Sequence, residues 1–180
     1  MISPDDLANR IRSMGFACTS CGACCRGSGD DSGLVLATPR EVRSVMEATG
    51  LAWEEVAMPY PEMIDGPSGA RYTLGWCILH EGGTCRFLND GKCSVYSSRP
   101  WICRTYPFML DGDDLLVSDC PGIGRDMTEE EADNLARDLI ARKGAEEAEA
   151  GGVRDVLRTT RLPHGRTAVI DSEGVKVLHG

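Results

Sequence analysis

The stretch Cys18-Thr-Ser-Cys21-Gly-Ala-Cys24-Cys25 places four of the nine cysteines of this chain within eight residues. A two-residue gap lets the backbone fold back, so that two sulfurs reach one metal centre while backbone N–H groups point at the thiolates. Gly22 suits such a turn because glycine adopts positive φ at no steric cost. Cys24 and Cys25 would point to opposite faces of an extended backbone, so they serve different ions, or one binds while the other packs. The stretch predicts a thiolate metal site.

The other five cysteines are too widely spaced to form a site alone, so a complete site has to be assembled across the fold. Buried structural thiols are the alternative, but scattered structural cysteines should not cluster. Four thiolates satisfy one tetrahedral zinc or one [4Fe–4S] cluster, and eight satisfy two such centres or one cluster and a structural ion. The five are Cys77, Cys85, Cys93, Cys103 and Cys120.

Composition limits the classes of function. A length of 180 residues suits one domain, or one domain with a short appendage. The formal net charge of -9 argues against nucleic-acid binding, which needs a positive surface. No stretch of about 18 apolar residues is present to span a bilayer, and Met1-Ile-Ser-Pro-Asp-Asp6 lacks the basic and apolar regions of a secretory signal. We expect a cytoplasmic protein, whose thiols stay reduced.

Capping signals predict the helices. Ser3-Pro4-Asp5-Asp6 begins a helix that runs to Met14, and the capping box Thr38–Glu41 opens another that ends at Gly50. A short helix is expected within 51–58. A second capping box, Thr128–Glu131, opens a helix that reaches about Ala150, where the pair Gly151-Gly152 should end it.

Short apolar runs and turn residues predict the strands. Strands are expected at 34–37, 71–79 and 115–117, and a C-terminal β-hairpin at 167–178. Asn89-Asp90-Gly91 should form a turn whose arms bring Cys85 and Cys93 together. The segments 27–33 and 59–69 read as connections without regular structure.

Together these elements predict an α+β fold, with a small, cysteine-rich and loop-rich metal-centred core, flanking capped helices and a C-terminal hairpin. We expect a cysteine-cluster domain over 1–125, which includes the helix at 3–14, and an appendage of helix and hairpin over 126–180.

Two enzyme signatures fail at the same position. Radical S-adenosylmethionine enzymes use C-x-x-x-C-x-x-C, and the ferredoxin run needs a fourth cysteine three residues after the third, but position 28 is serine. Of the three histidines, only His80 lies among the cysteines, so it is the one reserve ligand.

The ordered series of motifs resembles the YkgJ-like cysteine cluster family, whose module is the zinc- or iron-chelating CxxCxxCC domain. The matching pieces are Cys18-x-x-Cys21-Gly-x-Cys24-Cys25, Leu34-Val-Leu-Ala-Thr-Pro-Arg-Glu41, Cys85-x-Phe-Leu-x-x-x-x-Cys93-Ser-Val-Tyr96, Arg99-Pro-x-x-Cys103-Arg-Thr-Tyr-Pro-Phe108 and Cys120-Pro-Gly-Ile-Gly124.

By that resemblance the metal ligands are cysteines of these motifs, and Cys77 is an extra. Arg99 and Arg104 are then expected to donate hydrogen bonds toward the sulfurs and so to tune a cluster. The ligands implied are Cys18, Cys21, Cys24, Cys25, Cys85, Cys93, Cys103 and Cys120.

The function favoured from the sequence is an iron–sulfur protein, with a [4Fe–4S] cluster, that acts in electron transfer or redox sensing with a protein partner. A zinc-binding structural or interaction module is the alternative, since spacing alone does not separate the two ions. A weaker resemblance to flagellin lysine N-methylases, which carry a similar cysteine module, suggests an enzyme that uses S-adenosylmethionine.

Overall fold

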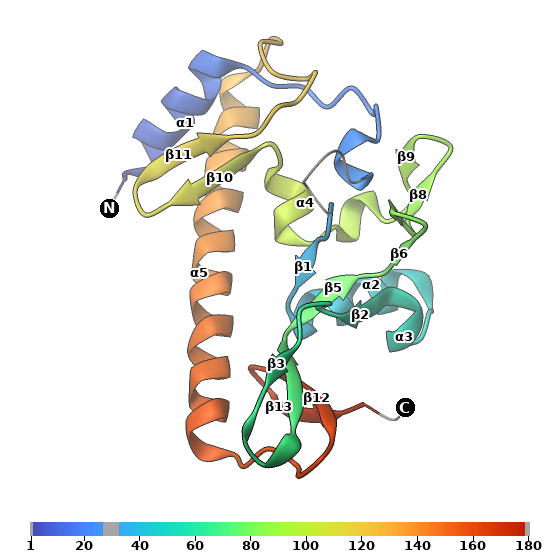
Figure 1. The fold of residues 1–180 in the computed structure, drawn as a ribbon. Helices are drawn as coiled ribbons and strands as arrows, with labels where there is room; N and C mark the ends of the chain where they lie inside the picture. The colour runs from blue at the N-terminus through green and yellow to red at the C-terminus, as the bar shows by residue number, and fades with distance from the viewer. Residues whose placement is uncertain (1, 27–32, 179–180) are drawn as a thin grey trace.

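The computed structural model describes residues 2–26 and 33–178, which form an α+β fold (Figure 1). A long helix, α5 (Glu129–Thr159), runs along one side of the molecule. Its first turns pack against α1 (Pro4–Met14) and the hairpin of β10 (Phe108–Asp111) and β11 (Asp114–Val117), and its last turns meet the C-terminal hairpin. The segments 21–26 and 80–93, which carry five of the cysteines, lie on the other side of the molecule.

The capping signals are confirmed at the starts of three helices. The Ser3 side chain accepts a hydrogen bond from the backbone N of Asp6 at the start of α1. Capping boxes open α2 at Thr38 and α5 at Thr128. The remaining helices are α2 (Pro39–Thr49), α3 (Trp53–Val56), α4 (Trp101–Thr105) and the 3-10 turns η1 (Ala23–Cys25), η2 (Pro67–Gly69) and η3 (Tyr96–Ser98).

Helix α5 continues through Gly151 and Gly152, so the prediction that this pair ends the helix is wrong. At Gly152 the helix passes the C-terminal hairpin so closely that an added Cβ would lie 2.5 Å from the Cβ of Ser172. Ser172 donates its backbone N–H and its hydroxyl to the Glu149 carboxylate, at 2.9 and 2.6 Å. A helical glycine costs only about 1 kcal/mol relative to alanine, and these contacts offset that cost.

Within the described part of the chain, the strands form five small sheets. The largest has the order β13-β12-β4-β3, with a parallel β12–β4 pair, and the second has the order β1-β5-β2. Three two-stranded ladders pair β6 with β7, β8 with β9, and β10 with β11. The bounds not yet given are β1 (Leu36–Ala37), β2 (Ala57–Pro59), β3 (Ile64–Asp65), β4 (Arg71–Leu74), β5 (Trp76–Ile78), β6 (His80–Glu81), β7 (Thr84–Cys85), β8 (Leu88–Asn89), β9 (Lys92–Cys93), β12 (Thr167–Asp171) and β13 (Gly174–Val177).

The segment 71–79 forms two strands, not the single strand expected. Gly75, at φ 80°, bends the chain between β4 in one sheet and β5 in another. The segment 59–69, expected to lack regular structure, contains β3 and η2, because β3 pairs with β4. Gly75 therefore divides the first segment between two sheets, and pairing with the next strand orders part of the second.

The other expected strands form with small changes in length. The strand at 34–37 is reduced to β1, and the one at 115–117 lies within β11. The short helix expected within 51–58 is α3, which leads directly into β2. The C-terminal hairpin is confirmed, with Asp171 opposite Gly174. The connection expected at 27–33 lies outside the described residues except for Gly33.

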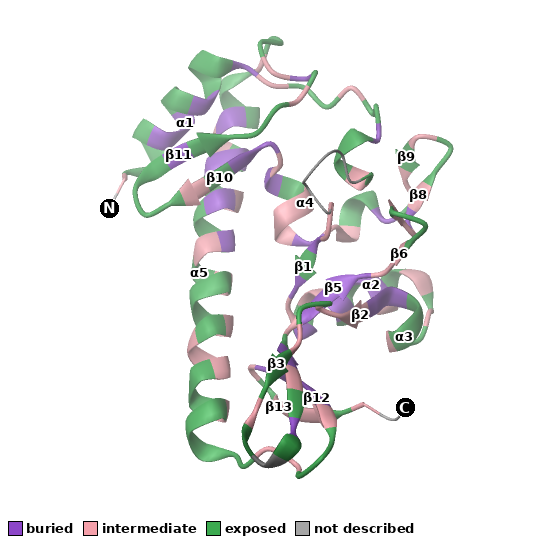
Figure 2. Ribbon diagram, viewed as in Figure 1, coloured by how far each residue is buried: buried purple, intermediate pink, exposed green. Residues whose placement is uncertain are grey.

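Two apolar clusters form the core (Figure 2). One joins α1, β10, β11 and the first turns of α5 around Phe108 and Leu139. The other joins α2, α3 and β5 around Val42, Trp76 and Ile78, and three half-buried cysteines pack against it. Those three are Cys85, Cys93 and Cys103.

The expected boundary at 125/126 crosses continuous structure, because β12 pairs with β4 and α5 packs on α1. Across residues 2–26 and 33–178, none of the helices combines the length and apolar character needed to cross a bilayer.

Candidate metal centre

All nine cysteines lie in the described residues and all are free thiols. Cys18 and Cys120 are the first and last candidate ligands along the chain, and a short stretch of backbone pairing lies next to both. It comes just before Cys18 in one segment and just after Cys120 in the other. Ala17 donates its N–H to the Gly122 oxygen at 3.1 Å, and an added Cβ at Gly122 would lie 2.4 Å from the Ala17 oxygen. The Sγ of Cys120 accepts a hydrogen bond from the backbone N of Gly122 at 3.4 Å. This pairing holds the two cysteine-bearing segments side by side.

The loop with the first four cysteines turns at Gly22, as the sequence predicted. Gly22 has φ 69° and begins η1, where its oxygen accepts the N–H of Cys25 at 3.1 Å. The neighbouring Cys21 thiol is exposed, and its pKa is lowered chiefly because the backbone N–H of Ala23 donates to the sulfur. A backbone N–H aimed at a thiolate is what the two-residue gap implied.

The turn at Asp90-Gly91 also forms, but its arms differ from the expectation. Cys93 lies opposite Leu88 in the β8–β9 ladder, whereas Cys85 lies opposite His80 in the β6–β7 ladder. The two sulfurs therefore come from successive hairpins and not from opposing arms of one hairpin.

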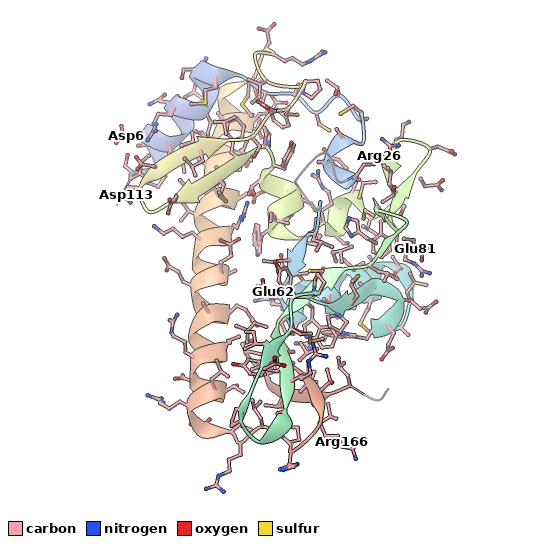
Figure 3. The ribbon with its side chains drawn as sticks, in the orientation of Figure 1. Asp6, Arg26, Glu62, Glu81, Asp113 and Arg166 are labelled. Atoms are coloured by element: carbon pink, nitrogen blue, oxygen red, sulfur yellow. The ribbon has the colours of Figure 1, made fainter. Side chains whose placement is uncertain are left out.

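Three backbone segments lie side by side at the end of the cysteine loop: β6, β7 and the residues around Arg26. Thr84 pairs with Glu81 on one side and with Arg26 on the other, and Arg26 and Glu81 are labelled in Figure 3. In antiparallel pairing the next residues, Cys85 and Cys25, then lie opposite each other. This pairing explains how a cysteine of the first motif meets one that lies 60 residues later in the chain.

Cys24, Cys25 and Cys85 form a chain of thiol contacts. The sulfurs of Cys24 and Cys25 are 4.0 Å apart, and the bond to Cys25 raises the pKa of Cys24. The bond to Cys24 lowers the pKa of Cys25. Its bond to Cys85, burial and the charges of Cys85 and Cys93 raise this pKa more strongly, to about 11. The pKa of Cys85 is lowered because it accepts from Cys25.

Cys103 joins the same group from α4. Burial, followed by the charges of Cys25, Cys24 and Cys93, raises the pKa of Cys103 to about 12. A cation among these sulfurs would reverse that penalty, because a metal ion stabilises the thiolate form of each ligand.

Six of the eight candidate ligands thus influence one another through their charges, and they come from the cysteine loop, β7, β9 and α4. Within 2–26 and 33–178, no three or more His, Cys, Asp or Glu side chains are arranged so that they could hold an ion. The sulfurs are neighbours, but they are not close enough together to coordinate one ion. The six are Cys21, Cys24, Cys25, Cys85, Cys93 and Cys103.

Arg99 and Arg104 have different surroundings. Arg99 lies 3.5 Å above the Tyr96 ring, donates to the Tyr96 and Cys103 carbonyl oxygens, and its charge lowers the pKa of Cys103 and of Cys24. Arg104 lies 4.9 Å from the ring centroid of Trp101. The Arg26 guanidinium donates to the Cys21 carbonyl oxygen at 3.3 Å, so Arg26 and Arg99 both contact segments that carry candidate ligands.

Cys77 and His80 also lie close to the group in sequence. Cys77 is fully buried in β5, and burial alone raises its pKa to about 11, so no other thiol influences it. The Nδ1 of His80 is 2.9 Å from the Ile78 oxygen, and its Nε2 is buried with no hydrogen-bond partner among the described residues.

A cavity of about 250 Å³ opens beside Cys24 and Cys103. The Arg142 side chain from α5, 7% exposed, lines it and donates to Thr105 and to Glu146, at 3.0 and 2.6 Å. Sequence reasoning missed Arg142, because nothing in an Ala- and Glu-rich helix distinguishes this arginine from exposed ones.

Comparison with known proteins decides the family. Residues 17–138 match the CxxCxxCC family, which is described as a "putative zinc- or iron-chelating domain". The chain belongs to this family. The matched region of the CxxCxxCC domain contains all eight candidate ligands together with the start of α5. The YkgJ-like resemblance expected from the motifs is thereby confirmed, and metal binding is the function that the family supports.

The CxxCxxCC domain also has a curated relative. The chain is 26% identical over 102 residues to a protein of Methanocaldococcus jannaschii whose printed name is "Uncharacterized protein MJ0661". The alignment covers 56% of this chain and 48% of the relative, so the chain spans about half the length of that protein. No solved structure matches the chain significantly.

The donor set of this CxxCxxCC domain suits a zinc ion or an iron–sulfur cluster. Both take sulfur ligands, and the six neighbouring thiols are half-buried or exposed at the edge of an apolar core. Hard cations such as Mg²⁺ prefer oxygen ligands and fit this set poorly.

Proposed function

We propose that this chain holds an iron–sulfur cluster, of the [4Fe–4S] type, through cysteine thiolates and acts in electron transfer or redox sensing. The observation that carries the proposal is the group of six thiols, from four segments, that influence one another electrostatically. A [4Fe–4S] cluster takes four cysteine thiolates, and the chain has nine cysteines but only three histidines, which favours a centre bound mainly by sulfur. A cluster would supply one-electron chemistry over a wide range of potentials.

In that function the protein would supply positive charge beside the thiolates and an opening through which a partner reaches the sulfurs. The guanidinium of Arg99 offsets some of the negative charge of the thiolates, since it lowers the pKa of Cys103 and Cys24. Hydrogen bonds and charges around the sulfurs tune a cluster's potential. The cavity beside Cys24 and Cys103 gives a partner a short approach to the sulfurs.

Partner and compartment are part of the proposal. A net charge of -9 favours a protein redox partner over a nucleic acid. Nine free thiols suit a reducing compartment, and we assign the protein to the cytoplasm on that ground.

The decisive experiment is purification without oxygen, followed by iron, zinc and sulfide determination and a visible spectrum. The expected result is a coloured protein with iron and sulfide in near-equal amounts. A colourless protein without iron would refute the iron–sulfur proposal. The Cys103→Ser variant should lose the colour, whereas Cys77→Ser, which alters a thiol that no other cysteine influences, should keep it.

A zinc-binding structural or interaction module is the second candidate, and His80 favours it. Zinc accepts mixed sulfur and nitrogen ligands, and the buried Nε2 of His80 has no partner among the described residues. In that case zinc would be found without sulfide, and a chelator would unfold the protein, because metal binding contributes to the free energy of folding.

A further inference from the structure

His80 lies in the row of three paired backbone segments formed by β6, β7 and the residues around Arg26, and this row carries the candidate ligands Cys25 and Cys85. It lies directly opposite Cys85 in the β6–β7 ladder, and Cys25 follows on the other side of Cys85. Residues directly opposite in an antiparallel pair share one face, with Cβ atoms about 4.5–5.5 Å apart. Cys85 also interacts with the Cys25 side chain. The His80 side chain therefore lies on the same face of the row as two sulfurs.

The hydrogen bond of His80 fixes which ring nitrogen is free. Nδ1 is 2.9 Å from the Ile78 carbonyl oxygen, and a carbonyl only accepts, so Nδ1 carries the proton. In the neutral ring Nε2 then has a lone pair. Metal-binding histidines commonly use this arrangement, in which one ring N–H bonds a backbone carbonyl and the other nitrogen binds the ion.

Nε2 lacks a partner that would use this lone pair. The atom is buried and accepts no hydrogen bond from the residues described. A buried acceptor left unpaired costs about 1–3 kcal/mol. The neighbouring Glu81 belongs to the opposite face, where Arg86 reaches its carboxylate at 3.4 Å.

We propose that His80 supplies a nitrogen ligand, through Nε2, to the metal centre that contains Cys25 and Cys85. This inference rests on the proposed thiolate centre and adds a ligand that the cysteine motifs do not contain. The centre is then a mixed sulfur and nitrogen site. The Ile78 carbonyl acts as the group that orients the ring.

The variant that tests this role is His80→Asn. The asparagine amide can still donate to the Ile78 oxygen in place of Nδ1, but nothing replaces Nε2. His164→Ala is the matched control, because His164 is exposed in the connection between α5 and β12. A His164→Ala/His179→Ala chain keeps His80 as its only histidine, so a signal from that chain belongs to His80 even if His80→Asn fails to fold.

The measurement uses the full chain, reduced, freed of metal and loaded with ¹¹³Cd²⁺, with ¹⁵N-labelled histidine. The expected result is a ¹¹³Cd–¹⁵N coupling at Nε2 of one imidazole that persists in both control chains and disappears in His80→Asn. We also expect His80→Asn to weaken Cd²⁺ binding at least about tenfold, with His164→Ala unchanged.

Two results would overturn the inference, and they differ in what they imply for the thiolate centre. Binding of Cd²⁺ to thiolates, seen as sulfur-to-metal absorption, with no coupled imidazole or with one other than His80, would refute the His80 ligand and leave the thiolate centre. No Cd²⁺ binding by the unaltered chain would refute the His80 ligand, whereas the iron–sulfur proposal is refuted separately, by the absence of iron and sulfide from the protein purified without oxygen.

Discussion

Glu41 Oε1 accepts a hydrogen bond from the backbone N of Trp101 at 2.7 Å, so the residue that caps α2 also holds the first residue of α4. Its other oxygen, Oε2, accepts from the backbone N and the hydroxyl of Thr38. Because α4 carries Cys103, one carboxylate links the α2 cap to the placement of a candidate ligand.

Removing that carboxylate should therefore cost more than the loss of a cap. We expect Glu41→Ala to lower the free energy of unfolding by about 2–4 kcal/mol, from the cap and from the unpaired Trp101 N–H. Glu131→Ala is the control, because Glu131 caps α5 in the same way and lies exposed, and it should cost only about 1 kcal/mol. Urea unfolding measures both, and equal losses would contradict the second role of Glu41.

The exposed thiols Cys21 and Cys24 should react at different rates in the reduced, metal-free protein. The Ala23 N–H lowers the pKa of Cys21, whereas the bond to Cys25 raises the pKa of Cys24. The thiolate is the reactive form, so iodoacetamide at neutral pH should label Cys21 more than about tenfold faster. Peptide mapping by mass spectrometry after timed quenching measures both rates, and equal labelling would count against this arrangement of donors.

Two glycines of α5 should respond to alanine with opposite signs. Gly144→Ala should stabilise the protein by about 0.5–1 kcal/mol, because nothing lies within 4 Å of the added Cβ and alanine favours the helix. Gly152→Ala should destabilise it by about 1–3 kcal/mol, because its Cβ would lie 2.5 Å from that of Ser172. Thermal unfolding of the pair tests this, and a stabilising Gly152→Ala would show that the hairpin packs differently against α5.

Cys77 and Cys103 should separate core packing from metal binding. Cys77→Ala removes a fully buried side chain and should cost on the order of 1 kcal/mol of stability while metal content stays unchanged. Cys103→Ala should instead lower the metal content, since Cys103 lies in the electrostatic group. Metal analysis alongside urea unfolding measures both effects. If Cys77→Ala lost the metal and Cys103→Ala kept it, Cys77 would be the metal ligand and Cys103 the packing residue.

Local chemistry made the helix starts and tight turns predictable. The Thr38 and Thr128 capping boxes and the Asp90-Gly91 turn depend on residues three or fewer positions apart, and all three form. The candidate ligands could be named because the cysteine motifs are short and ordered, and the family match covers them.

Long-range pairing decided what the sequence did not show. The break at Gly75 and the continuation of α5 past Gly152 each depend on a partner far away in the chain, whereas the short β3 strand pairs with the next strand, β4, across η2. The position of Cys85, opposite His80, is set by the local turn at Gly82-Gly83, and not by the turn at Asn89-Asp90-Gly91 that predicted Cys93 as its neighbour. The ladder that places Cys25 beside Cys85 could not be read from spacing either.

The parallel pair of β12 and β4 matters for any shortened form of the chain. Without the last hairpin, β4 would keep only β3 as a neighbour, and β3 pairs with just Arg71 and Tyr72. The β4 edge that faces β12, where Arg71 and Gly75 donate their N–H groups to Arg166 and Ile170, would then be open, which invites self-association. The family match ends at residue 138, so the hairpin that shields this edge lies outside the matched region.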